Sequence, residues 1–279
     1  MKMNRAHLSS LPLGATLPFI TLSRVREVVY RFTWPWLLPT GLMLIWWLSA
    51  HYELIAPQVL PGPAAVLTAA MDMIANGQLT EHMSISTQRV LLGFLMGSGM
   101  GLLIGVAMGL SERVSDYLYP LVRVIAYVPL LGWIPLLMLL LGIGETLKVI
   151  LVAKAALLPV ALNTCNSIRA VSPRLIEVGR LYGFSHRQLL WRVIFPAAFP
   201  SIWSSIRYAL TKSWLALVVV ELLASSEGLG FLMVDSRQLY QLDVMLVAVA
   251  AIGLIGFLLD LGLALIERRI LRWRHSGFA

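Results

Sequence analysis

Six charged side chains lie within long apolar segments of this 279-residue sequence, namely Arg123, Lys154, Arg207, Lys212, Glu221 and Asp260. A charge at membrane depth is costly, so such side chains usually face a water-filled cavity, the interior of a helix bundle or one another. Lys154 and Lys212 could stabilise a passing anion in surroundings of low dielectric constant. We therefore take Lys154, Lys212 and Glu221 as candidate residues of a transport pathway.

The same charges also have a purely structural interpretation. Lys154 could form a buried ion pair with Glu221 or Asp260 of another segment. Arg123 and Arg207 could extend their charged ends toward the membrane surface while their stems stay buried. The sequence alone favours this structural interpretation over an anion pathway.

Other kinds of chemistry find little support in the sequence. The five histidines are scattered, and the single cysteine, Cys165, has no Cys or His neighbour at zinc spacing. Glu221 and Asp260 have no recognisable nucleophile or metal partner. We therefore expect no catalytic residue and no metal site, which argues against the alternative of a membrane-embedded enzyme.

The elements that position these residues are expected to be membrane helices. The chain is 58% hydrophobic and only 13% charged, with a mean hydropathy of +0.80, which excludes almost any soluble protein. Its long unbroken apolar runs are untypical of the alternating strands of an outer-membrane barrel. The sequence predicts an all-α membrane protein, a polytopic bundle of about six transmembrane helices. The expected spans are residues 34–50, 90–110, 118–141, 147–162, 193–223 and 244–266.

Basic residues cluster in alternate loops between these spans, which accounts for the net charge of +8 without nucleic-acid binding. Because short cytoplasmic loops carry the excess of Lys and Arg, both termini are expected in the cytoplasm. Residues 1–33 then form a cytoplasmic N-terminal tail, because the apolar stretch 11–22 is too short and proline-broken for a signal peptide. Residues 34–270 form the transmembrane domain and residues 271–279 a cytoplasmic tail. Cys165 is expected to face the cytoplasm and to react with thiol reagents from that side.

Glycines form a ladder in the second span. They recur every four residues, at Gly93, Gly97, Gly101, Gly105 and Gly109. Such a ladder predicts that another helix packs against it backbone to backbone. Whether this seam is static or belongs to a moving bundle stays open.

Prolines predict interruptions elsewhere. Pro120, Pro129 and Pro135 are expected to interrupt the third span, and the sequence around Pro129 and Pro135 predicts two breaks in its hydrogen-bond ladder. Broken backbone at membrane depth is tolerated where it is buried in protein or lines an aqueous path. Between the first two spans, residues 64–75 are expected to form a short external helix that ends at Asn76-Gly77.

The loop at residues 170–195 is too long and too polar for a simple connection. Ser172 can cap a helix that starts at Pro173, and Gly183 can end it in a left-handed conformation. Ser185 can then cap a second short helix that leads into Pro196. The sequence predicts a helix-turn-helix that serves as a cytoplasmic docking element.

This loop resembles the EAA loop of ABC-importer permeases. The family pattern is Glu-Ala-Ala, three residues, Gly, nine residues and then Ile-x-Leu-Pro, and Glu177, Gly183 and Pro196 match it at the right spacing. Val178 and Gly179 depart from its commonest residues. Segments similar to permeases of the nitrate, sulfonate and taurine importer group occur at residues 60–63, 142–146, 195–202 and 228–231.

The resemblance implies the fold of a type I ABC-importer permease in a bacterial inner membrane. It also implies partners: two copies of a cytosolic ATP-binding subunit, a periplasmic substrate-binding protein and a second permease copy that makes a homodimer. The residues that the resemblance assigns to coupling with the ATPase are Glu177, Val178, Gly179, Tyr182, Gly183 and Pro196.

The chain has no glycine-rich phosphate loop followed by Lys-Ser or Lys-Thr. ATP and Mg are therefore expected on the partner ATPase, with no cofactor bound by this chain. The implied substrate is a small anion such as an aliphatic sulfonate, taurine or nitrate. The alternatives are another small solute, such as bicarbonate or a thiamine precursor, or a structural anchor, which would leave the proline-broken spans unexplained.

Overall fold

A computed structural model of the protein describes residues 22–272, and in its first helix the side chains of Trp34 and of residue 36 onward. Most of the two expected cytoplasmic tails lies outside the described residues. The described chain is helical and contains no strand. It divides into two units, Met1–Pro57 and Gln58–Ala279.

The first unit contains α1, which spans Leu22–His51. This helix includes the predicted span 34–50, and it begins within the segment that was expected to be a tail. Large apolar side chains such as Trp36, Leu38 and Leu42 are exposed along it. A helix surrounded by lipid presents such a surface.

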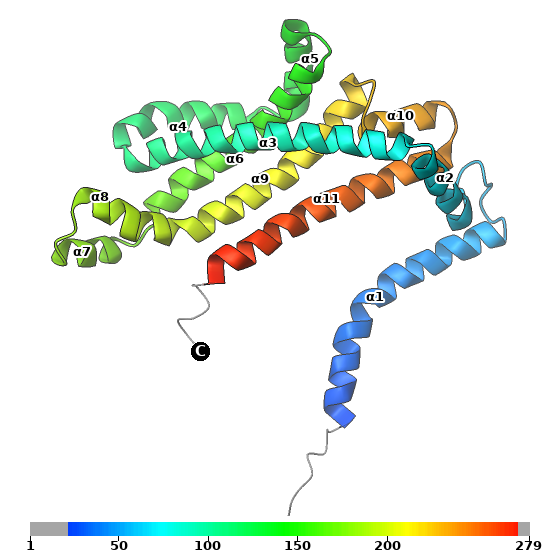
Figure 1. The fold of residues 1–279 in the computed structure, drawn as a ribbon, viewed down its shortest axis with the longest axis horizontal. Coiled ribbons are helices and arrows are strands. Elements are labelled where there is room, and N and C mark those ends of the chain that lie inside the picture. Colours follow the sequence, from blue (N-terminus) through cyan, green and yellow to red (C-terminus); the bar gives the residue numbers. More distant parts are fainter. Residues whose placement is uncertain (1–21, 273–279) are drawn as a thin grey trace, which may run out of the picture. The chain divides into compact units, whose positions relative to one another are not determined.

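The second unit contains the remaining helices (Figure 1). They are α2 (Pro63–Ala75), α3 (Gln78–Leu110), α4 (Glu112–Tyr127), α5 (Leu130–Leu141), α6 (Glu145–Arg169), α7 (Pro173–Leu181), α8 (His186–Leu189), α9 (Phe195–Ala224), α10 (Leu229–Gln238) and α11 (Leu242–Ile270). A π-helical turn, Leu190–Ile194, joins α8 to α9. The predicted short helix that ends at Asn76-Gly77 is thereby confirmed as α2, with Gly77 in the left-handed conformation.

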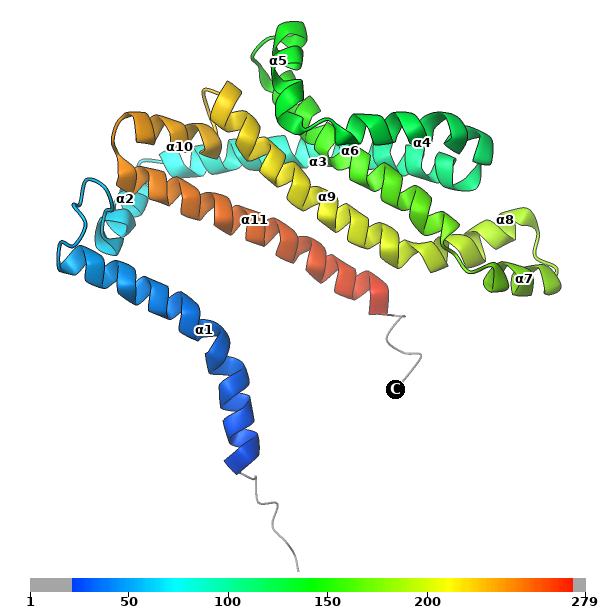
Figure 2. The same ribbon diagram turned by 180° about the vertical axis from the view of Figure 1, so that it is seen from behind.

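Each predicted span corresponds to helical structure. Within the described residues, α3 and α11 are individually long and apolar enough to cross a membrane. Two bent pairs raise the number to four if each pair counts as one span: α4 with α5, and the segment His186–Ala224 with α10. Helix α6 packs mainly against α3 and α9, whereas α11 packs against α10, α2 and α9 (Figure 2).

The glycine ladder of α3 faces α6. A Cβ atom built on Gly93 would lie 2.6 Å from Cγ1 of Val152, and one built on Gly101 would lie 2.7 Å from the carbonyl oxygen of Leu157. At Gly97 an added Cβ would collide with the backbone carbonyl of Ala153. The absence of side chains is therefore what lets the two helices approach so closely. Gly105 and Gly109 meet α6 in the same way, at Ala161 and Ile168.

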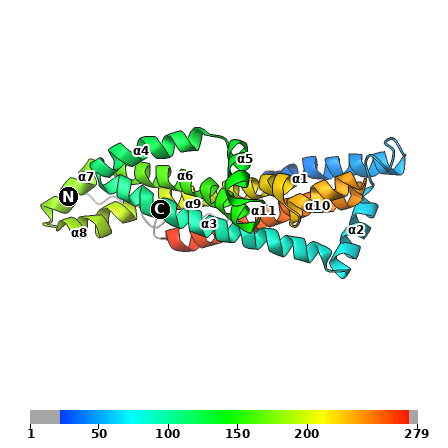
Figure 3. The same cartoon turned by 90° about the horizontal axis from the view of Figure 1, so that it is seen from above.

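The third predicted span is broken once rather than twice. The chain turns by 97° between α4 and α5, at Val128 and Pro129 (Figure 3). Val128 has an extended ψ of 116°, the conformation that a residue before proline favours. Pro120 and Pro135 lie inside α4 and α5 instead. A proline removes only one ladder hydrogen bond, which a membrane helix tolerates when its surroundings compensate.

Candidate functional site

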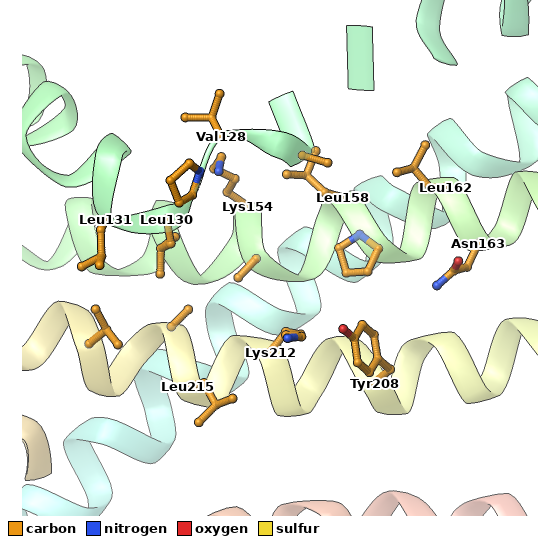
Figure 4. Close-up of a pocket in the computed structure, with 16 residues that line it drawn as sticks. Val128, Leu130, Leu131, Lys154, Leu158, Leu162, Asn163, Tyr208, Lys212 and Leu215 are labelled. Carbon is orange, nitrogen blue, oxygen red and sulfur yellow. The ribbon is translucent and has the colours of Figure 1, made fainter. Parts of the chain in front are cut away.

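A cavity of about 680 Å³ lies among α6, α9 and the break between α4 and α5. We call it the lysine cavity, because Lys154 of α6 and Lys212 of α9 both line it (Figure 4). Asn163 and Tyr208 are its other polar lining residues, and the rest are Ala, Val, Leu or Pro. The structure thus brings together two of the three pathway candidates, from segments far apart in the sequence.

Neither lysine forms an ion pair within the described part of the chain. The ammonium of Lys154 lies 4.7 Å from the centre of the Trp133 ring, and that of Lys212 lies 5.3 Å from the centre of the Tyr208 ring. A cation–π contact holds the ammonium group in place without neutralising its charge. Both positive charges are therefore available to an anion in the cavity.

Glu221 does not line the lysine cavity. Its carboxylate is fully buried and lies 2.9 Å from the guanidinium of Arg89 in α3. Ser86 donates a hydrogen bond to it, as does the backbone N–H of Gly230 at 3.0 Å. The possible pairing of Lys154 with Glu221 is therefore wrong, because other donors already satisfy this carboxylate.

Arg89 also binds Glu145 at the start of α6, through two hydrogen bonds of 2.6 and 2.5 Å. Gly228, at φ +102°, leaves room for the Glu221 carboxylate, with which an added Cβ would collide. The contacts of Arg89 and Glu221 therefore join α3, α6, α9 and the start of α10. Sequence reasoning missed Arg89, although an arginine directly before an apolar span is a signal for such a site.

Asp260 is also unavailable to Lys154. Arg207 of α9 donates two hydrogen bonds of 2.6 Å to its carboxylate, and a third of 3.3 Å to Glu267. This ion pair links α9 to α11, so Arg207 does not simply extend toward the surface as expected. Arg123 is exposed and donates a hydrogen bond of 3.2 Å to the hydroxyl of Tyr127.

The loop at 170–195 forms the predicted helix-turn-helix, in α7 and α8. Gly183 has φ +72°, and the N–H of Phe184 donates to the carbonyl of Gly179, which closes α7. Ser185 begins α8 with a capping box: its hydroxyl accepts from the N–H of Gln188, whose side chain accepts from the N–H of Ser185. These caps give the loop a defined shape.

Apolar side chains are exposed on this loop. Leu181 is 86% exposed, Tyr182 78% and Val178 49%, and the Glu177 side chain beside them is also exposed. Gly179 is buried instead. Leu189 packs so closely against it that an added Cβ would lie 2.8 Å from the Leu189 side chain. Pro196 lies at the start of α9, directly after the π-helical turn Leu190–Ile194. An exposed apolar group on a rigid polar loop is typical of a protein-binding surface.

Cys165 differs from its expected accessibility. Its side chain is completely buried in α6, against α3 and α4. It therefore cannot report from which side a thiol reagent enters. Among the described residues no group of three or more His, Cys, Asp or Glu side chains could hold a metal ion.

The chain is similar to known proteins in its sequence and in its fold. The family described as "Binding-protein-dependent transport system inner membrane component" matches residues 90–272, more than half of the chain. The putative aliphatic sulfonates transport permease protein SsuC of Bacillus subtilis (strain 168) is 37% identical, over 94% of this chain and 97% of that protein.

Two further relatives have other substrates in their names. The taurine transport system permease protein TauC of Escherichia coli (strain K12) is 35% identical, over 83% of this chain and 86% of its own. The nitrate import permease protein NrtB of Synechocystis sp. is 29% identical, over 75% and 79%. A solved amino acid ABC transporter shares the fold, with a TM-score of 0.58 at 21% identity over 71% of this chain and 97% of that one.

Proposed function

Because this chain belongs to the family of binding-protein-dependent transport system inner membrane components, and so is a permease of an ABC importer, we propose that its cargo is a small organic anion of the aliphatic sulfonate class. The observation that carries this proposal is the lysine cavity, with two unpaired ammonium groups among apolar walls. Three relatives are named for the transport of aliphatic sulfonates, taurine or nitrate, solutes that carry an anionic group, and so support a cargo with such a group.

The lining of the cavity favours one kind of anion. A sulfonate group would interact with Lys154 and Lys212, and a short alkyl chain would lie against apolar residues such as Leu158 and Leu215. Nitrate has no alkyl group that could use these walls. Taurine carries an ammonium group, and no carboxylate lines the cavity to receive it. Like charges in such surroundings repel strongly, so the zwitterion is a poorer fit.

The assembly that we propose is a homodimer of this chain with two ATPase subunits and an external binding protein. ATP and Mg bind to the ATPase, and this chain carries no cofactor. The exposed side chains of Val178, Leu181 and Tyr182, beside Glu177, are the proposed contact with the ATPase. Both termini and this loop lie in the cytoplasm, since Arg and Lys concentrate on that side.

Uptake into proteoliposomes that contain the permease, the ATPase and the binding protein tests the cargo class. We expect ATP-dependent accumulation of propanesulfonate, slower transport of taurine and nitrate, and no transport of choline. The affinity of the binding protein for each solute is measured separately by calorimetry, so that uptake per bound solute reports on the permease. Accumulation of choline without propanesulfonate would contradict the proposal.

A further inference from the structure

A second cavity adjoins the lysine cavity on the side of the loop at residues 170–195, which we call the coupling loop. It has a volume of about 430 Å³ and shares Asn163 and Tyr208 with the lysine cavity. Its other lining residues are Asn166, Ser167, Ala170, Ser201, Ser204 and Ser205. We call it the serine cavity. All of its lining side chains are uncharged.

One face of α6 and one face of α9 line both cavities. On α6 the lining residues recur every three or four positions toward Ala170, and on α9 they do so toward Ser201. In the lysine cavity each face is apolar apart from one lysine. From Asn163 on α6 and Tyr208 on α9 onward, the lining residues of the serine cavity carry amide or hydroxyl groups, apart from Ala170. Ala170 is the first residue of the coupling loop and Ser201 follows the loop closely in α9, so the serine cavity is the part of the path nearer that loop.

Hydrogen-bond donors in the serine cavity can be counted. Ser167 already donates to the hydroxyl oxygen of Ser201 at 2.8 Å. Ser204 and Ser205 donate to backbone carbonyls at 3.1 and 2.9 Å. An anion needs donors, and those that remain are the amides of Asn163 and Asn166 and the hydroxyls of Tyr208 and Ser201.

We propose that Asn163, Tyr208, Asn166 and Ser201 form a neutral hydrogen-bonding site that receives the oxygen atoms of an anion when it leaves the two lysines. This inference rests on the proposed function of the lysine cavity. The ligand class is a sulfonate or another oxyanion head group. Neutral donors can bind the oxygen atoms of the anion, but they lack the charge–charge attraction of the two ammonium groups, so the site favours onward release over retention.

Two reporter cysteines in the assembled complex test this site. Ser204→Cys places a thiol in the serine cavity, and Leu215→Cys places one in the lysine cavity. The native Cys165 is buried and adds no background. Reaction with a charged methanethiosulfonate reagent is followed in open membrane fragments, with and without propanesulfonate. We expect propanesulfonate at about four times its dissociation constant to slow the labelling of both cysteines by about fivefold, since protection by a bound ligand scales as one plus the ratio of ligand concentration to Kd.

The double substitution Tyr208→Phe and Asn163→Leu removes two donors and keeps the ring beside Lys212. Protection from labelling by propanesulfonate should disappear at Ser204→Cys and persist at Leu215→Cys. General damage to the protein would abolish the protection of both cysteines. Tyr117→Phe, at an exposed tyrosine outside both cavities, is the matched control and should change neither.

The outcomes separate the two proposals. Protection of Leu215→Cys alone, or protection of Ser204→Cys that survives the double substitution, would overturn the neutral site and leave the lysine cavity intact. Absence of protection at both reporter cysteines would overturn the proposed function itself.

Discussion

Arg89 in α3 and Glu221 in α9 form a buried ion pair, with 2.9 Å between the guanidinium and the carboxylate and side chains that are 4% and 0% exposed. Arg89 is therefore the partner of Glu221, the acidic residue nearest in the sequence to Lys212. Arg207 binds the Asp260 carboxylate at 2.6 Å, in an ion pair that is partly exposed. Neither carboxylate is therefore left to pair with Lys154 or Lys212.

Removing one member of the buried pair should be severely destabilising. Arg89→Met leaves the Glu221 carboxylate buried without its counter-charge, at an expected cost of about 3–5 kcal/mol. Thermal unfolding of the purified complex in detergent measures this loss. Glu81→Ala, at an exposed position in the same helix, should change stability by less than about 0.5 kcal/mol. Equal melting temperatures for Arg89→Met and Glu81→Ala would show that the pair does not hold the four helices together.

The glycine ladder offers a test of the seam between α3 and α6. Gly97→Ala places a Cβ against the carbonyl of Ala153, whereas the Cβ of Gly99→Ala meets open space on the same helix. We expect Gly97→Ala to cost about 1–3 kcal/mol through overpacking and Gly99→Ala to be harmless. The comparison of unfolding midpoints is decisive, since the two substitutions are chemically identical. Similar midpoints would contradict the close approach of these helices.

Gly183 tests the coupling loop. Its left-handed conformation costs a residue with a β-branched side chain about 1–2 kcal/mol, and an added Cβ there meets no other atom. Gly183→Val should therefore reduce co-purification of the ATPase and uptake together, while the affinity of the binding protein for its ligand is unchanged. Asn tolerates this conformation, so Gly183→Asn should retain most of the ATPase co-purification and most of the uptake. Full uptake by Gly183→Val would refute the coupling role of the loop.

Local features were predictable from the sequence because their causes are local. Gly183 ends α7 and Ser185 caps α8 through backbone geometry and neighbouring atoms alone. The apolar runs likewise gave the positions of the long helices, since membrane thickness fixes their length. Pro129 breaks its helix whereas Pro120 does not, and nothing in the composition of the span distinguishes them.

The partners of charged side chains were not predictable. Arg89 and Glu221 are far apart in the sequence and meet only after α3, α6 and α9 pack. Many pairings of six intramembrane charges are equally consistent with one sequence, so the pairing of Lys154 with an acid was a reasonable but incorrect alternative. The burial of Cys165 depends on the same packing.

That burial changes how the membrane orientation has to be tested. Wild-type protein should resist an impermeant thiol reagent from both sides, because Cys165 is inaccessible. Glu112→Cys, between the second and third spans, should be labelled in inside-out vesicles only. Leu239→Cys, in the turn before α11, should be labelled in intact spheroplasts only. The reverse pattern would invert the proposed orientation.

Uptake by lysine variants tests the account most directly. Lys154→Met and Lys212→Met, singly and together, are compared with Lys→Arg at the same positions for propanesulfonate uptake and for thermal stability of the assembled complex. We predict that the Met variants lose at least about tenfold in uptake, equivalent to about 1.4 kcal/mol, while Lys→Arg retains part of it. Stability should stay unchanged or rise, because neither lysine leaves a carboxylate unpaired. Normal uptake by the double Met variant, or a loss of stability of about 3–5 kcal/mol that accompanies the lost uptake, would contradict an anion pathway through this cavity.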